Sequence, residues 1–153
     1  MRLSKIVLLA ALVGLLGGIA APAGARSGAR LQQLKPSQRM QQATNRSRLS
    51  HGVHRVWLNA RLSDLARKHS LAMASAGSLF HTADPASYYL NGIRWHVWGE
   101  NVGVSGAGAY QMESAFMASP PHRANILRPS FAHSAVGAVW VRGQLWVTVF
   151  FYG

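Results

Sequence analysis

Three short stretches of the chain combine residue types that could act together chemically. Phe80-His81-Thr82 and Pro121-His122-Arg123 each carry a histidine, and Gly99-Glu100-Asn101 carries a carboxylate. The whole sequence contains only four Asp and Glu residues, so a Glu between Gly and Asn is not expected to be ordinary surface charge. We expect His81, Glu100 and His122 to lie on three separate turns and to share one polar cleft.

Two imidazoles and one carboxylate fit three interpretations. They form a plausible ligand set for Zn²⁺ or another divalent metal, with one position left for water. The same side chains also fit a metal-free, hydrogen-bonded cleft, or three unrelated local roles. Because the ligands come from distant segments, their spacing does not distinguish these alternatives.

Several other chemistries lack the residues that they need. The chain has no cysteine, which excludes thiol catalysis, thiolate metal sites and disulfides. The stretch 103–107, Gly-Val-Ser-Gly-Ala, fails the nucleophile-elbow pattern because its fifth residue is Ala. No phosphate-binding Gly-x-x-x-x-Gly-Lys-Ser/Thr and no His-Glu-x-x-His motif is present in the sequence.

The first residues have the pattern of a secretory signal peptide. A basic start is followed by an apolar run at 6–19 and by the small-x-small site Ala23-Gly24-Ala25. The run is shorter than the roughly 18 residues that span a bilayer. We therefore predict a signal peptide at 1–25, a basic flexible leader at 26–37 and one domain at 38–153. The mature chain is expected to be exported, extracellular or periplasmic, and to have no transmembrane segment.

Positive charge is concentrated in the first part of the predicted mature chain. Residues 26–68 contain ten Lys and Arg against one acid, and residues 69–153 contain four against three. Such a regional charge attracts acidic lipid head groups or an anionic envelope polymer, with an affinity that falls as salt rises. The alternative is that arginine only keeps an exported protein soluble. No RNA- or DNA-binding motif accompanies the charge, so no specific nucleic-acid recognition is expected.

The remaining patterns predict an α+β domain, with helices first and an antiparallel pair last. A weakly amphipathic helix is expected at 38–49, with Ser37 as its cap. In the next helix, steps of three and four place one set of residues on a core face: Leu58, Leu62, Leu65, Ala66, His69 and Met73. Here His69 is interpreted as a buried histidine with a hydrogen-bond partner. Gly77 ends this helix, and Asp84-Pro85 is expected in a loop.

A third helix is expected at 107–118, where Ala109, Met112, Glu113 and Phe116 share a face. Pro120-Pro121 is expected to end it. The chain then finishes in a hairpin, with strands at 136–142 and 145–152 and a glycine in the turn.

Taken in order, these motifs resemble the CAP superfamily, which contains the cysteine-rich secretory, venom-allergen and pathogenesis-related proteins. The residues that carry the resemblance are Asn45-x-x-Arg48, Leu65 to Ser70 with Met73, Phe80-His81, Gly99 to Val102, Ser119 to Leu127, Phe131, Val136-Gly137 and the aromatic final strand. The chain is similar to the cysteine-free bacterial branch of this group. The resemblance implies an α-β-α sandwich with a small, mostly antiparallel sheet flanked by helices.

The resemblance also implies that His81, Glu100 and His122 line a central cleft. Members often carry a second Glu three residues after an aromatic residue, and here that position is Ser119. Glu113 lies one turn before Phe116 and is expected to be a solvated helix residue rather than a replacement. Supporting positions are also implied in the cleft: Ser119, Asn101 and Asn125. The other histidines, His51, His54, His96 and His133, match no shared functional position.

For function, the resemblance favours a secreted bacterial binding module for extracellular lipid, envelope or host ligands. The first alternative is a metal-assisted hydrolase with Glu100 as general base and with His81 and His122 as ligands. The second is a structural envelope protein held by its basic leader. The sequence favours the binding module, since it contains neither an activated nucleophile nor a complete pair of carboxylates.

Overall fold

A four-stranded sheet with strand order β1-β3-β4-β2 organises the part of the chain that the computed structural model describes, residues 34–153. The elements in chain order are α2 (Pro36–Ser50), β1 (Trp57–Leu58), α3 (Ala60–Ala76), α4 (Pro85–Leu90), β2 (Trp98–Ser105), α5 (Ala109–Ala118), α6 (Pro120–Ile126), β3 (His133–Val141) and β4 (Gln144–Tyr152). The signal peptide predicted at 1–25 and most of the predicted leader lie outside the described residues. Within residues 34–153, no helix is both long and apolar enough to span a membrane.

The predicted C-terminal hairpin is present as β3 and β4, although β3 begins at His133, three residues earlier than expected. Arg142 and Gly143 form its two-residue turn with φ values of 50° and 75°. Two successive positive φ values are typical of the tight turn that matches the twist of antiparallel strands. β2 pairs antiparallel with β4, and the short β1 pairs parallel with β3.

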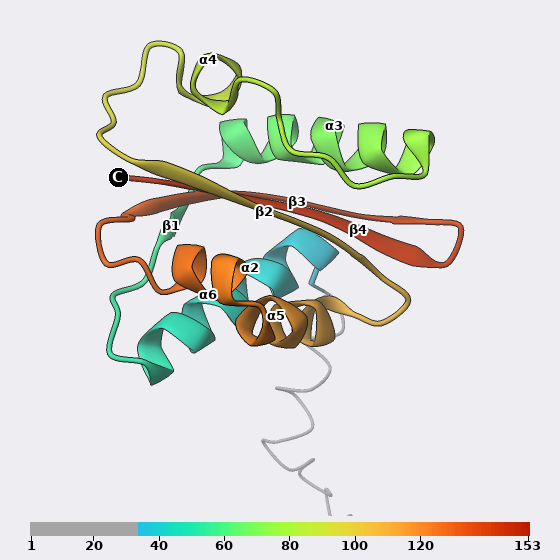
Figure 1. The fold of residues 1–153 in the computed structure, drawn as a ribbon, viewed down its shortest axis with the longest axis horizontal. Helices are drawn as coiled ribbons and strands as arrows, with labels where there is room; N and C mark the ends of the chain where they lie inside the picture. The colour runs from blue at the N-terminus through green and yellow to red at the C-terminus, as the bar shows by residue number, and fades with distance from the viewer. Residues whose placement is uncertain (1–33) are drawn as a thin grey trace, which may run out of the picture. The chain divides into compact units, whose positions relative to one another are not determined.

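Helices cover both faces of this sheet, with α3 and α4 on one side and α2, α5 and α6 on the other (Figure 1). The central strand β4 alternates between the two layers. On one face it packs Leu145, Val147, Val149 and Phe151 against the layer of α2, α5 and α6. On the other it packs Trp146, Phe150 and Tyr152 against α3 and α4. The α-β-α sandwich predicted by the resemblance is therefore confirmed.

Helix α3 packs unusually close to the sheet. A Cβ placed on Gly137 would lie 2.2 Å from the backbone carbonyl of Ala66, so only glycine leaves room for the helix at this point of β3. The helix starts where the Asn59 side chain accepts from the Leu62 amide, and it ends at Gly77 with φ of 65°, as predicted. Its core face was predicted correctly except for Leu58, which lies in β1 and is 42% exposed.

The start of α2 was predicted two residues too late. Lys35, rather than Ser37, is its N-cap, and the Lys35 amide donates to the side chain of Gln38. Pro36 occupies the first helical position, where its missing amide hydrogen costs no helical hydrogen bond. The last two residues of the predicted leader thus belong to the helix.

Two short helices were missed altogether. Asp84-Pro85, expected in a loop, caps and begins α4, because the Asp84 carboxylate accepts from the Ser87 amide. Pro120-Pro121 does follow the end of α5, but it also begins α6, which carries His122. Helix α5 itself starts at Ala109, two residues later than expected, and its predicted apolar face is buried.

Candidate functional site

Glu100 lies in the edge strand β2, not on a turn as predicted. It pairs with Phe150 of β4, and its side chain is only 2% exposed. Val102, on the same face of β2, packs against α3 with Met73 and Ala74. Since alternate strand residues share a face, Glu100 also faces the α3 layer and Asn101 faces the opposite one.

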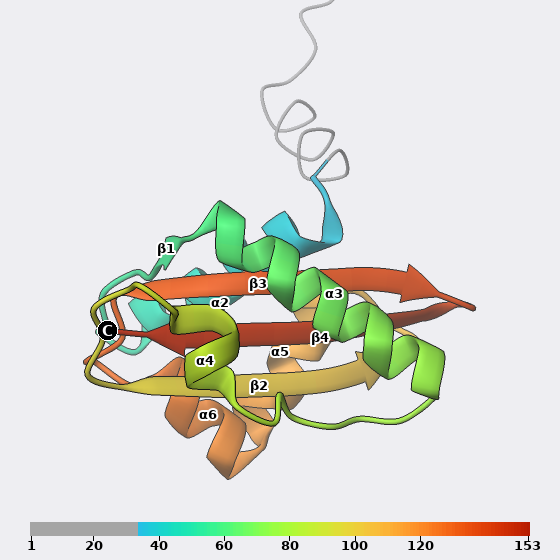
Figure 2. The same ribbon diagram turned by 90° about the horizontal axis from the view of Figure 1, so that it is seen from above.

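The segment between α3 and α4 runs beside β2 and supplies the partners of this carboxylate (Figure 2). His81 Nδ1 lies 2.9 Å from Glu100 Oε2. The Thr82 amide donates to the same oxygen at 3.0 Å, and the Thr82 hydroxyl donates to Oε1 at 2.7 Å. Oε2 of Glu100 thus accepts from His81 and from Thr82, and Oε1 accepts from Thr82 alone.

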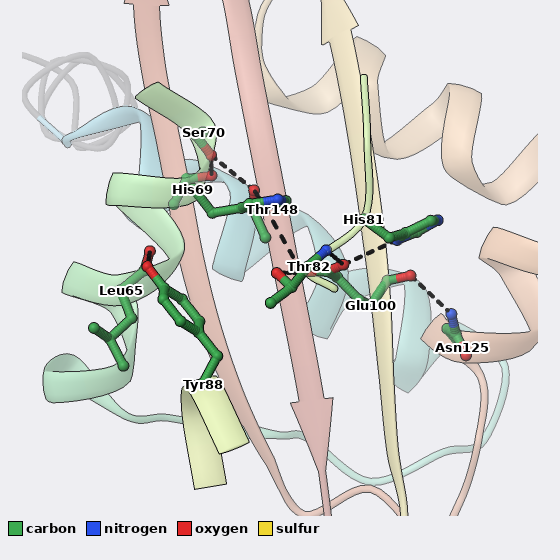
Figure 3. A network of polar contacts seen from close by, with 10 residues as sticks. Leu65, His69, Ser70, His81, Thr82, Tyr88, Glu100, Asn125 and Thr148 are labelled. Carbon is green, nitrogen blue, oxygen red and sulfur yellow. Dashed lines mark hydrogen bonds and ion pairs between the residues drawn. The ribbon is translucent and has the colours of Figure 1, made fainter. Parts of the chain in front are cut away.

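A second histidine approaches Glu100 from inside the domain. His69 Nδ1 lies 3.8 Å from Glu100 Oε1 and 3.1 Å from the hydroxyl of Thr148, which also accepts from Ser70 (Figure 3). Burial lowers the pKa of His69, partly opposed by the negative charge of Glu100. The prediction that His69 is buried with a hydrogen-bond partner is confirmed, and that partner belongs to the network behind the site.

The opposite face of β2 organises His122. Asn101 donates to the His122 carbonyl at 3.0 Å. Asn125 donates to the side chain of Asn101 at 2.9 Å and to the Glu100 carbonyl at 3.3 Å. The imidazole of His122 packs 4.9 Å from the ring of Phe116, and its pKa is lowered by burial and then by the charge of His81. His81 and Glu100 are thus in contact on one face of β2, whereas His122 is held through its backbone carbonyl from the other face.

A pocket of about 350 Å³ opens over this edge. Its wall consists of His81, Thr82, Pro85, Trp98, Gly99, Glu100 and Asn125. A second pocket of about 440 Å³ shares His81 and Thr82 with the first and is lined mainly by hydrocarbon and aromatic groups that include Ala72, Phe80 and Tyr88. We call these two spaces the polar pocket and the apolar pocket.

Gly99 explains how α6 comes so close to β2. A Cβ at this position would lie 2.6 Å from Asn125 Oδ1 and 3.1 Å from the ring of Phe131. Any side chain would therefore push away the asparagine that connects Glu100 and Asn101. Gly, Glu and Asn at 99–101 each have a separate role in the site.

The donor atoms fit a metal only in part. Because His81 Nδ1 is engaged with Glu100, the outward nitrogen of that ring is Nε2, and the imidazole side chain is 60% exposed. Glu100 has the position of a carboxylate that orients a histidine ligand. In residues 34–153, no group of three or more His, Asp or Glu side chains is arranged to hold a metal ion. A site made by His81 and His122 stays a prediction.

Ser119 stands where the resemblance implies a second Glu, and the nearest acidic residue in sequence, Glu113, does not replace it. Ser119 connects α5 and α6 as the cap of both helices. Glu113, predicted to be solvated, is instead buried against α2, where it accepts from the Thr44 hydroxyl at 2.9 Å. Burial raises the pKa of Glu113 above its usual value. It therefore belongs to the interface between α2 and α5.

The four other histidines of the described residues are exposed, as expected: His51, His54, His96 and His133. Sequence reasoning missed Thr82, Thr148 and Trp98 as parts of the site. Thr82 follows His81 directly, so an extended segment with two successive donors was the available signal. Thr148 and Trp98 carried no such signal, because only the pairing of β2 with β4 brings their strands together.

Comparison with known proteins gives one family match and one curated relative. The model of the cysteine-rich secretory protein family, CAP, matches residues 41–150. YkwD of Bacillus subtilis (strain 168), an uncharacterized protein, is 30% identical over 112 residues, which cover 70% of this chain and 43% of YkwD. The chain thus spans less than half the length of this relative.

Solved structures have the same fold. An extracellular protein containing a SCP domain from Bacillus anthracis str. Ames superposes with a TM-score of 0.67 at 21% identity, over 81% of this chain and 43% of that one. An outer surface protein from Borrelia burgdorferi gives 0.68 at 11% identity, over 76% and 91%. A cysteine-rich secretory protein from Staphylococcus aureus subsp. aureus Mu50 gives 0.62 at 21% identity, over 76% and 38%.

Proposed function

The chain belongs to the CAP family of cysteine-rich secretory proteins, and we propose that it is an exported bacterial module that binds an amphipathic extracellular ligand at the site around Glu100. Export is supported by the signal-peptide pattern at 1–25 and by relatives named as extracellular or outer surface proteins. Intact-mass measurement of exported protein tests this step. A chain that starts at Arg26 is expected, and one that retains Met1 would contradict it.

The hydrogen bonds that Glu100 accepts are the observation that supports a binding role over a catalytic one. A general base needs a lone pair that faces the substrate proton. Here both oxygens of a 2% exposed carboxylate accept hydrogen bonds from His81 and Thr82. Glu100 is thus suited to hold the wall of the polar pocket in place, rather than to take a proton from a substrate.

The two pockets together indicate the class of ligand. The polar pocket offers imidazole, hydroxyl and amide groups, and the apolar pocket offers the side chains of Ala72, Phe80 and Tyr88. Because His81 and Thr82 border both spaces, one ligand can place a polar head group on one side and a hydrocarbon chain on the other. Pockets of a few hundred Å³ with few polar groups are typical of small-molecule sites.

Titration with a fluorescent long-chain fatty acid tests this proposal. Ala72→Trp should fill the apolar pocket and weaken binding about tenfold, and His81→Ala should weaken it about fivefold. Matched controls are Ala118→Trp, on the exposed end of α5, and His96→Ala, an exposed histidine outside both pockets. No binding by the parent protein, or equal losses in variants and controls, would contradict the proposal.

One observation favours hydrolysis as a second function. Glu100 holds His81 Nδ1, which leaves Nε2 of a 60% exposed ring free to act as the base. A carboxylate that orients an imidazole is used in hydrolases whose histidine takes a proton from the attacking group, and here that group would be water, because the sequence contains no activated nucleophile. In this version the base is His81 rather than Glu100. Hydrolysis of casein tests this function. If the parent protein and His96→Ala hydrolyse casein and His81→Ala does not, the site around Glu100 is that of a hydrolase rather than of a binding module. Failure of both assays leaves a structural envelope role.

A further inference from the structure

A basic groove on the surface of α2 lies outside the site around Glu100. Its larger part, about 670 Å³, is lined by Gln41, Gln42, Asn45, Arg46, Leu49, Ser50 and Arg55. A smaller part of about 480 Å³ is lined by Leu49, His54, Arg55 and Trp57. Leu49 and Arg55 line both parts, so the two are adjacent, and we call them together the α2 groove.

The floor of the α2 groove is held by buried amide groups. The Val56 amide donates to Asn45 Oδ1 at 2.9 Å, and the Val56 carbonyl accepts from Asn45 at 3.1 Å and from Gln41 at 2.9 Å. These bonds fasten the extended segment after α2 along the helix. Val56 is 1% exposed, whereas its neighbours Arg55 and Trp57 are exposed to solvent.

The groove combines positive charge with an exposed aromatic ring. Arg46 lies 5.5 Å from the ring of Tyr110, which helps to hold its guanidinium at the edge of α2. Trp57 is 70% exposed, the highest value among the exposed large hydrophobic side chains of the described residues. Large exposed aromatic groups beside arginines are typical of binding surfaces.

Neutral hydrogen-bonding groups separate the charges. Gln42, Arg46 and Ser50 follow one another at steps of four, so they form one row along α2. Among residues 34–153, no Asp or Glu lines either part of the groove. Glu113, which accepts a hydrogen bond from Thr44 of α2, is buried and lines neither part of the groove. The lining of the groove therefore carries the positive charges of Arg46 and Arg55 without a carboxylate among the described residues.

We propose that the α2 groove binds a phosphodiester-linked polyol or sugar chain. Guanidinium groups bind phosphate oxygens through paired hydrogen bonds, which fits Arg46 and Arg55. The amide and hydroxyl groups between them match hydroxyl-bearing units, and the face of Trp57 can pack against their C–H groups. In such a polymer the phosphates lie in the backbone of the ligand, so each of them is accessible to arginines in an open groove. This site acts independently of the polar and apolar pockets.

The test uses labelled poly(glycerol phosphate) as the probe and fluorescence polarisation over a range of NaCl concentrations. The double variant Arg46→Gln/Arg55→Gln should bind about tenfold more weakly and show a shallower salt dependence, with a slope reduced by about 1.4 for two lost phosphate contacts. Trp57→Ala should weaken binding about threefold and leave the slope unchanged. The matched control is Arg67→Gln/Arg94→Gln, which removes two exposed arginines outside the groove and should change affinity less than about twofold.

Several outcomes would overturn the proposal. Equal losses in the groove variant and the matched control mean that the whole charge of the domain, not the groove, attracts the polymer. Tighter binding to polygalacturonate, which lacks phosphate, or to vesicles of anionic phospholipid means that the ligand class is wrong. Tighter binding to single-stranded DNA, whose phosphodiester chain also carries bases, would mean that the groove selects a nucleic acid instead of a base-free chain. No binding by the parent protein excludes the site. Because Ala72→Trp and His81→Ala leave the groove intact, their effects on fatty-acid binding are separate from this result.

Discussion

Replacing Arg48 by Lys should destabilise the domain strongly, although the charge is kept. Arg48 is fully buried, and its guanidinium donates to four carbonyls, those of His54, Ile126, Arg128 and Phe131, at 2.6 to 3.0 Å. A lysine ammonium is a single point with three hydrogens, so it cannot reach acceptors that the planar guanidinium meets from three nitrogens.

The size of the effect follows from the bonds that are lost. A hydrogen bond to a charged group contributes about 1.5–3 kcal/mol. With one to two of the four lost, we expect the free energy of unfolding to fall by about 3 kcal/mol. For a domain of this size that corresponds to a decrease in Tm of about 12 °C.

Urea and thermal unfolding followed by circular dichroism measure this change. The matched control is Arg46→Lys, the same substitution at an exposed position of the same helix, which should stay within about 0.5 kcal/mol of the parent. The carbonyl of Ile126 belongs to the last residue of α6, so the loss of its hydrogen bond to Arg48 should also make amide exchange in α6 faster. An Arg48→Lys protein as stable as the control would refute the reasoning.

Three further predictions concern other buried positions and the metal. Since burial raises the pKa of Glu113, its protonated form stabilises the fold below about pH 4.3 and this contribution is lost as pH rises through the folded-state pKa. Glu113→Gln should therefore gain stability over the parent at pH 8 and not at pH 4, and a gain equal at both values would contradict this. Gly137→Ala should cost about 2 kcal/mol or more in urea unfolding because its Cβ meets α3, whereas Gly106→Ala, in open space, should be neutral. Calorimetric titration with zinc should give weak binding that His81→Ala and His122→Ala abolish and His96→Ala preserves; equal affinity in all four proteins would place the metal elsewhere.

The spacing of apolar residues along the sequence correctly predicted which side of a helix faces the core and where the last two strands lie. The core face of α3 and the apolar face of α5 follow steps of three and four, and the last hairpin follows its branched residues and the glycine of its turn. Each of these signals lies within one element, so no knowledge of its neighbours was needed.

The errors arose where tertiary contacts decide the outcome. Glu113 looked like a solvated helix residue, but Thr44 of α2 gives it a buried partner that no local pattern reveals. The proline pair at 120–121 was interpreted as a stop signal, whereas proline is equally suited to the first turn of the next helix. β2 was not recognised as a strand, because glycine and charged residues disfavour strands and only pairing with β4 compensates.

The contiguity of Gly99, Glu100 and Asn101 has a structural reason. Neighbouring residues of a strand face opposite sides of the sheet, and an edge strand leaves one flank open to loops and helices. Glu100 thus holds His81 from the α3 side, while Asn101 holds the carbonyl of His122 from the α6 side.

Because β2 lies at the edge of the sheet, Asn125 of α6 reaches the polar pocket beside His81 and Glu100. The two histidines are therefore positioned by adjacent residues, although 41 positions separate them in the chain. Asn125 connects the two halves because it donates both to the backbone of Glu100 and to the side chain of Asn101. A displacement of α6 would consequently move His122 and loosen the strand that carries Glu100 at the same time, so the whole site depends on the packing that Gly99 permits.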